Sequence, residues 1–221
     1  AALGAWDGMT AWRVSPFRDM RVWDATGFGQ IHFDSASLGE PLLGWIIENR
    51  VIQSALLESV RRLPTVDWLC PALLETAEPL AETGWRVRLK DGREFTTRLL
   101  IGADGVQSQV RHQAGIAVSG WGYDQNAVVA NVRTAESHQQ TAWQRFLPTG
   151  PLAFLPLADG RCSIVWATPP QQADTLLALD DSDFALALAD AFDRRLGAIT
   201  KVGPRRAFPL RLQHAQAYVK P

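Results

Sequence analysis

Residues 98–111 read Arg-Leu-Leu-Ile-Gly-Ala-Asp-Gly-Val-Gln-Ser-Gln-Val-Arg. The apolar run from Leu99 to Ile101 predicts a buried strand, which breaks at the Gly-Ala-Asp-Gly turn of residues 102–105. An amphipathic segment follows, so the chain is expected to pass from a strand into a helix. This turn fixes a carboxylate beside a glycine, and a glycine lets another molecule approach the backbone closely. The pattern therefore indicates a contact for a nucleotide or cofactor.

Asp104 has two interpretations. Asp104 and Gln107 have the spacing of a capping box, with Asp at the N-cap and Gln at N3. Alternatively, the free N–H groups and the positive dipole end of the following helix suit a diphosphate, and the carboxylate can accept hydrogen bonds from sugar or ribityl hydroxyls. The spacing leaves both open, and they are compatible because a cap can also face a ligand.

The composition is that of a globular protein, with 221 residues, 47% hydrophobic and 20% charged. A net charge of -1 gives no electrostatic reason to expect nucleic acid. Neither Cys70 nor Cys162 has a Cys or His at metal-ligand spacing, so no metal is expected, and both are predicted to be buried free thiols in a reducing compartment. No apolar run reaches the roughly 20 residues of a membrane-spanning helix, and no signal peptide is evident.

Hairpins and a meander dominate the rest of the pattern. Alternation of apolar and polar residues predicts two hairpins, the second turning at Asp91-Gly92, and i, i+3, i+4 spacing predicts a helix before Pro64. The expected strands are 20–24, 30–34, 84–89, 94–101, 126–133, 141–147, 152–157, 161–167 and 206–210, and the expected helices are 48–63, 106–114 and 182–196. These elements predict an α+β (mixed α/β) fold with a mostly antiparallel sheet.

Four consecutive segments are expected along the chain. They are an irregular lead-in (1–20), a mixed region that contains the Asp-Gly turn (21–120), a sheet with a helix (121–210) and a tail (211–221). No internal repeat or low-complexity tract interrupts them.

A family resemblance covers the chain from about Met20 to Leu210. Leu99 to Gly105, with Ser108 and Arg111, resembles the Asp-Gly motif of the para-hydroxybenzoate-hydroxylase-like flavoprotein monooxygenases. Other segments agree in order. The Glu-Asn pair at 48–49 resembles the subgroup of ubiquinone-biosynthesis polyprenylphenol hydroxylases. The further matching segments are 45–56, 152–157, 162–166 and 184–197.

The resemblance implies an FAD-dependent monooxygenase that uses NAD(P)H as reductant and O2 to hydroxylate a prenylated phenol or quinol. The protein would supply position, desolvation and electrostatics, while the flavin carries the oxygen chemistry. A prenylated substrate also implies a cytoplasmic protein with peripheral contact at the inner membrane, and other ubiquinone-biosynthesis proteins as partners.

Six residues take roles through this resemblance. Asp104 and Gly105 would form the pyrophosphate-side cofactor contact, and Asn49 or Arg50 would lie near the flavin. Phe154 and Trp166 would floor the phenol pocket, although both also fit ordinary sheet core, because pocket walls and core look alike in sequence. No catalytic residue is singled out. The four histidines are scattered, and no Gly-x-Ser-x-Gly elbow supports a hydrolase.

Two departures from the family lead to a further expectation. The chain contains neither the Gly-x-Gly-x-x-Gly motif nor the later Gly-Asp motif of the flavin site. The chain is therefore expected to be a central fragment, inactive alone and binding FAD weakly or not at all. The alternative is a non-catalytic module that binds an apolar ligand or a protein on its Trp-rich sheet.

Overall fold

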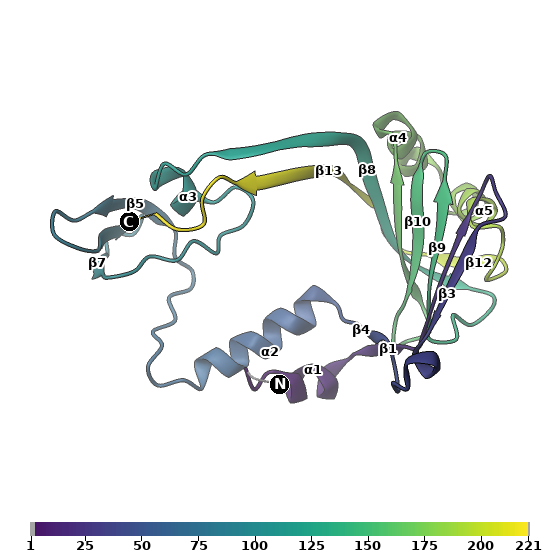
Figure 1. Ribbon diagram of the computed structural model, residues 1–221, viewed down its shortest axis with the longest axis horizontal. Helices are drawn as coiled ribbons and strands as arrows, with labels where there is room; N and C mark the ends of the chain where they lie inside the picture. Colours follow the sequence, from purple (N-terminus) through teal and green to yellow (C-terminus); the bar gives the residue numbers. More distant parts are fainter. Residues whose placement is uncertain (1–2, 221) are drawn as a thin grey trace. The chain divides into compact units, whose positions relative to one another are not determined.

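The computed structural model describes residues 3–220 (Figure 1). One compact unit combines the chain up to Leu63 with Asp124–Leu210, and the other combines Pro64–Tyr123 with the chain from Arg211 onward. The units are therefore interleaved in sequence, unlike the consecutive segments expected above. Residues 21–63 belong with 124–210 because their two strands join the same sheet, and the residues expected as a tail belong to the second unit.

The first unit is built on an eight-stranded sheet with the order β12-β8-β11-β10-β9-β2-β3, in which β13 also pairs with β8. All pairs along this path are antiparallel except β2 with β9. The expected hairpin of β2 and β3 and the expected meander are confirmed. The strands are β2 (Asp19–Asp24), β3 (Gln30–Asp34), β8 (Val118–Thr134), β9 (Thr141–Leu147), β10 (Gly150–Pro156), β11 (Cys162–Thr168), β12 (Ile199–Val202) and β13 (Arg206–Ala215).

Two helices, α4 (Pro170–Ala178) and α5 (Asp181–Ala191), cover one face of this sheet. The single helix expected over 182–196 is therefore wrong at its end. Helix α5 stops at Ala191, and Asp193 and Arg194 then adopt positive φ values of 58° and 49°. Pro170 takes the first position of α4, where a missing N–H costs nothing. The core lies between these helices and the sheet.

Four further elements with helical or strand geometry belong to the first unit: α1 (Trp6–Trp12), β1 (Ser15–Phe17), β4 (Gly44–Ile46) and α2 (Asn49–Arg61), with a short 3-10 helix at Ser35–Leu38. The irregular lead-in expected for residues 1–20 is therefore wrong, because α1 packs on α2 and β1 pairs with β4. The expected helix before Pro64 is confirmed, and it buries Val51 and Ala55.

The second unit contains a three-stranded sheet of β5 (Leu74–Pro79), β6 (Trp85–Leu89) and β7 (Glu94–Thr97), and the short helix α3 (Gln109–Gln113). The hairpin of β6 and β7 is confirmed. The buried strand expected at 99–101 is wrong, since Leu99 and Ile101 are 70% and 75% exposed and no described strand pairs with them.

The α+β class is confirmed by these helices and mainly antiparallel sheets. Over residues 3–220, none of the helices has the length and apolarity needed to cross a membrane. The expectation of two buried thiols holds only for Cys162, because Cys70 is exposed. Burial raises the pKa of the Cys162 thiol to about 12, although a hydrogen bond with Thr134 lowers it slightly.

Candidate functional site

The Asp-Gly turn of the second unit is a helix cap. The Asp104 carboxylate accepts hydrogen bonds from the Ser108 hydroxyl, from the Gln109 backbone N–H at 2.7 Å and from the Val110 N–H at 3.3 Å. Ser108 is the N-cap of α3, and its Oγ accepts from the N–H of Arg111 at 3.0 Å. The first-turn N–H groups therefore have partners within the chain.

This geometry corrects two expectations about the turn. The helix begins at Gln109 and not at Val106, so Gln107 lies before the helix and Asp104 does not act as the N-cap of a capping box. The first-turn N–H groups that were expected to face a diphosphate are occupied by Asp104 and Ser108. Asp104 thus reaches across the turn as a second capping acceptor.

The pKa of Asp104 lies below its ordinary value of 3.8. Desolvation alone would raise this pKa, but the hydrogen bonds from Ser108 and from the backbone N–H groups of the turn together outweigh it. Hydrogen bonds to the ionised form favour it, so the carboxylate is held as an anion. It keeps a free lone pair on the oxygen that faces Ser108, because a carboxylate has about four acceptor positions.

A cavity of about 480 Å³ lies beside this turn within the second unit. Leu99, Ile101 and Gly105 are among its lining residues, and its size falls in the range of small-molecule sites. Gly105 has a φ of 83°, and a Cβ built there would meet nothing within 4 Å, so its backbone faces open space. Gly102 is different, since a Cβ there would lie 3.1 Å from the Val110 side chain.

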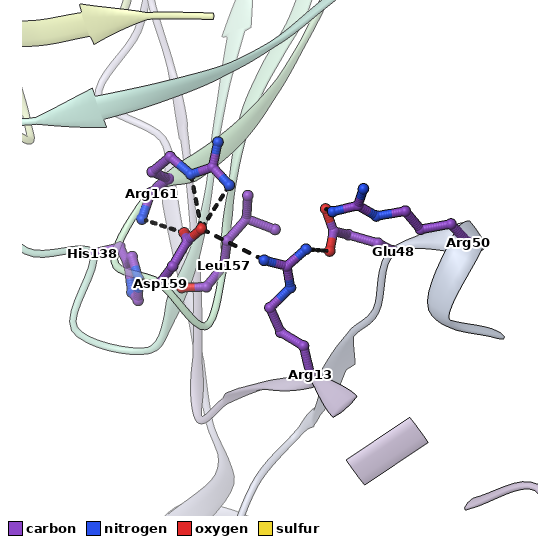
Figure 2. Close-up of polar contacts among 7 residues, drawn as sticks. All are labelled: Arg13, Glu48, Arg50, His138, Leu157, Asp159 and Arg161. Atoms are coloured by element: carbon purple, nitrogen blue, oxygen red, sulfur yellow. Dashed lines mark hydrogen bonds and ion pairs between the residues drawn. The ribbon is translucent and has the colours of Figure 1, made fainter. Parts of the chain in front are cut away.

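In the first unit, the N-terminus of α2 carries Asn49 and Arg50. Glu48 is the N-cap of this helix but makes no side-chain capping hydrogen bond. Both Asn49 and Arg50 are exposed, and the Arg50 guanidinium lies 3.6 Å from a Glu48 oxygen (Figure 2). These two side chains are open to a ligand, which is what the expected flavin contact requires.

Glu48 also belongs to an ion-pair network that no local pattern in the sequence predicts. The Arg13 guanidinium contacts the Glu48 carboxylate and lies 3.9 Å from an Asp159 oxygen, so it connects the end of α1 with the β10–β11 turn (Figure 2). Asp159 in turn accepts from the Arg161 side chain at 2.9 and 2.6 Å. The partners are up to 146 residues apart (Arg13 to Asp159), so only the Asp-Gly-Arg turn itself was visible in the sequence.

The charges of the β10–β11 turn stabilise one another. Hydrogen bonds from the Arg161 side chain lower the pKa of Asp159 below 3.8, desolvation opposes this, and the charges of Arg161 and Arg13 add to the lowering. The same hydrogen bonds raise the pKa of Arg161. His138 bonds the Leu157 carbonyl oxygen at 3.1 Å next to this turn (Figure 2).

Phe154 and Trp166 lie on the helix-covered face of the eight-stranded sheet. Phe154 is fully buried and stacks on Phe192 with ring centroids 3.8 Å apart. Trp166 is 3% exposed, and its indole N–H has no acceptor among the described residues. The structure therefore places both side chains in the core, which is one of the two alternatives that the sequence left open.

The opposite face of the sheet carries the neighbours of these residues. Successive side chains of a strand point to opposite faces, so Ala153 and Val165 lie on the face away from α4 and α5. The two residues are directly paired across β10 and β11, and Val165 is also paired with Val129 of β8. All three are half-buried, and they form a row of small apolar side chains.

Solved structures share this fold. The crystal structure of p-nitrophenol 4-monooxygenase PnpA from Pseudomonas putida has a TM-score of 0.72 and 17% identity, with 97% of this chain and 55% of that chain covered. The tetrameric form of 2-methyl-3-hydroxypyridine-5-carboxylic acid oxygenase has a TM-score of 0.72 and 18% identity, with 98% and 57% covered. The chain thus has the fold of these two structures.

A family model described as FAD binding domain matches residues 76–220, which is more than half of the chain. The chain therefore belongs to the FAD binding domain family.

Curated relatives are similar over most of this chain. The 3-demethoxyubiquinol 3-hydroxylase of Escherichia coli is 37% identical, with 99% of this chain and 55% of the relative covered. The ubiquinone hydroxylase UbiL of Rhodospirillum rubrum is 38% identical, with 98% and 50% covered. The ubiquinone biosynthesis monooxygenase COQ6 of Danio rerio is 40% identical, with 87% and 41% covered. The chain spans about half the length of these relatives.

Proposed function

We propose that the protein is an FAD-dependent monooxygenase that hydroxylates a prenylated phenol or quinol in ubiquinone biosynthesis. The observation that carries the proposal is the similarity to ubiquinone hydroxylases over nearly the whole chain, together with a row of small, half-buried apolar side chains on the sheet face opposite α4 and α5.

The residues present fit an FAD. Gly105 offers a backbone that a bound group can approach without a steric clash, and Asp104 keeps an acceptor position beside it. Asn49 offers an exposed amide and Arg50 an exposed guanidinium, 3.6 Å from Glu48, at the start of a helix of the first unit. We assign these four residues to the cofactor. FAD would supply the activation of O2 when bound.

The substrate ring is proposed to lie on the face of the sheet that carries Ala153, Val165 and Val129. Small apolar side chains leave a flat surface on which an aromatic ring can pack, and they exclude water from it. Phe154 and Trp166 support this surface from behind, because they fill the core under the same strands. We therefore propose that Phe154 and Trp166 support the substrate surface without contacting the substrate.

A complementation experiment tests the function. In a bacterial strain that lacks its own 3-demethoxyubiquinol 3-hydroxylase, we expect the complete reading frame of this protein to restore ubiquinone synthesis. The measurement is the quinone content by mass spectrometry. A folded, FAD-loaded protein that restores no hydroxylation of any ubiquinone precursor would contradict the proposal and favour a ligand-binding module.

Membrane contact and partner proteins follow from the substrate chemistry. A prenylated phenol resides in a bilayer, so we propose that the protein works at the cytoplasmic surface of the inner membrane with other ubiquinone-biosynthesis proteins. Phe28 supports this proposal because it is fully exposed at the tip of the β2–β3 hairpin. Flotation with vesicles is expected for the protein, and weaker flotation for Phe28→Ser.

A further inference from the structure

A second cavity of the first unit holds an excess of positive charge. It has a volume of about 330 Å³ and is lined by Asn131, Arg133, Asp159, Arg161, Lys201 and Gly203. Three of these six residues are cationic and one is anionic. The cations come from three neighbouring segments, namely β8, the β10–β11 turn and β12.

The single carboxylate of the cavity is already engaged. Asp159 accepts two hydrogen bonds from the Arg161 side chain and also lies near Arg13. Within residues 3–220, no ion pair involves Arg133 or Lys201. The cavity therefore presents two cations without a counter-charge.

The register of the sheet places these two cations directly opposite each other. Lys201 of β12 pairs with Arg133 of β8, next to an irregularity in the pairing between Ile199 and Lys201. Like charges at directly opposed positions destabilise an antiparallel pair. On the other side of the sheet, Val132 and Val202 pair and pack against the core, so the cations cannot turn away without exposing these apolar side chains.

The wall beside the two cations is backbone. The Gly203 N–H donates to the Asn131 carbonyl oxygen at 2.9 Å, and a Cβ at Gly203 would lie 2.8 Å from that oxygen. A larger residue at this position would push the strands apart. The chain thus holds the end of β12 close to β8 and keeps Arg133 and Lys201 together.

We propose that this cavity is a binding site for a phosphate group. A guanidinium and an ammonium form strong charge-assisted hydrogen bonds with phosphate oxygens, and a doubly charged anion neutralises both unpaired cations. Arg161 supplies a third donor group at the rim, while Asp159 holds it in place. The site differs from the Asp-Gly turn and from the helix α2 contacts, and it does not depend on the proposed function.

The test measures the melting temperature of the purified protein and its affinity for pyrophosphate. Inorganic pyrophosphate is the probe, and potassium chloride at equal ionic strength is the control. We expect pyrophosphate to raise the melting temperature of the natural protein. In Lys201→Gln and Arg133→Gln, we expect this rise to be lost and the affinity for pyrophosphate to fall about tenfold or more.

The same variants provide a second readout that a merely structural role would not give. Removal of one cation relieves the repulsion, so each variant without pyrophosphate is expected to melt at the same or a slightly higher temperature than the natural protein, by about 1–2 °C. Lys90→Gln is the matched control, because Lys90 is an exposed lysine of the second unit outside this cavity. It should respond to pyrophosphate like the natural protein.

Further arms identify the source of the phosphate. Inorganic phosphate, NADPH against NADH, and phosphatidylglycerol vesicles are compared in the natural protein and in Lys201→Gln. If one of these compounds binds the natural protein but not Lys201→Gln, the result supports the site and identifies the molecule that carries the phosphate group. No response to any of these anions, or a response that is equal in the natural protein, Lys201→Gln and Arg133→Gln, would overturn the proposal.

Discussion

The two faces of the eight-stranded sheet differ by one residue along each strand. Phe154 and Trp166 lie under α4 and α5 and are closed to solvent, whereas their neighbours Ala153 and Val165 point to the other face and are half-buried. The large aromatic side chains therefore belong to the core, and the small ones form the surface proposed for the substrate.

The two faces of the sheet therefore differ in the size of the side chains that they require. The helix-covered face needs volume, since interiors are close-packed. The opposite face needs space, since a ring that packs there requires room above the strands. A substitution on the helix-covered face should therefore lower the stability of the protein, whereas one on the opposite face should lower its activity.

The largest effect is expected at Phe154. Phe154→Ala should lower the free energy of unfolding by about 3–5 kcal/mol, because a fully buried phenylalanine leaves a cavity. Chemical denaturation followed by circular dichroism measures the loss. Leu155→Ala is the matched control on the opposite face and should cost less, and equal losses at the two positions would break the comparison between the faces.

The next effect concerns activity. Val165→Phe should lower kcat/KM for the prenylated phenol about tenfold or more, because a bulky ring on the opposite face displaces the substrate from its reactive position. The free energy of unfolding should change by less than about 1 kcal/mol, since the side chain is not in the core. Val165→Ala should remain active. Full activity of Val165→Phe would show that the substrate does not bind on this surface.

A smaller effect is expected at the β10–β11 turn. Asp159→Asn should destabilise the protein by about 1 kcal/mol, because it weakens the contacts with Arg161 and Arg13. The folded pKa of Asp159 is lowered, so this contribution is present above the unfolded pKa near 3.8 and is lost as the pH falls through the folded pKa. The free energies of unfolding of the natural protein and the variant should therefore approach each other as the pH falls below 3.8.

The matched control is the second Asp-Gly-Arg turn of the chain. Asp91 and Arg93 make the same hydrogen bonds as Asp159 and Arg161, but within residues 3–220 Asp91 has no ion-pair partner other than Arg93, and it lies on an exposed hairpin. Asp91→Asn should therefore cost less stability than Asp159→Asn. If the two substitutions had the same effect, the network with Arg13 would contribute nothing.

The smallest effect is local. Asp104→Ala should remove the hydrogen bonds from the Gln109 and Val110 N–H groups of α3 and cost about 0.5–1 kcal/mol. Hydrogen exchange of the Gln109 and Val110 amides should accelerate, while the amides of the β6–β7 hairpin should remain unchanged. Protection that persists at Gln109 and Val110 would show that Asp104 does not cap the helix.

Elements set by local chemistry could be predicted from the sequence. The Asp91-Gly92 turn defines its hairpin, and the 3.6-residue period defines α2. The prediction of a buried strand at residues 99–101 is wrong, because an apolar run forms a strand only if another strand pairs with it. Strand β12 was also missed, since its pairing with β8 joins residues far apart in the chain.

The site residues show the same limit. The Asp-Gly motif located Asp104 and Gly105, but the sequence could not say that α3 would use the carboxylate as a cap. Residues 152–157 are apolar at every position, so no alternation marked which side chains would face the helices. The network of Arg13, Glu48 and Asp159 depends on tertiary contacts and had no signal in the sequence.

The most direct test of the central claim is the source of the oxygen atom in the product. The protein purified from the complete reading frame, loaded with FAD and supplied with NAD(P)H and isotopically labelled O2, is incubated with a short-chain prenylated phenol, and the product is examined by mass spectrometry. We expect one labelled oxygen on the ring, with much less product from Val165→Phe than from Val165→Ala. A folded, FAD-loaded protein that incorporates no labelled oxygen, or a Val165→Phe variant that forms product as fast as Val165→Ala, would contradict this claim.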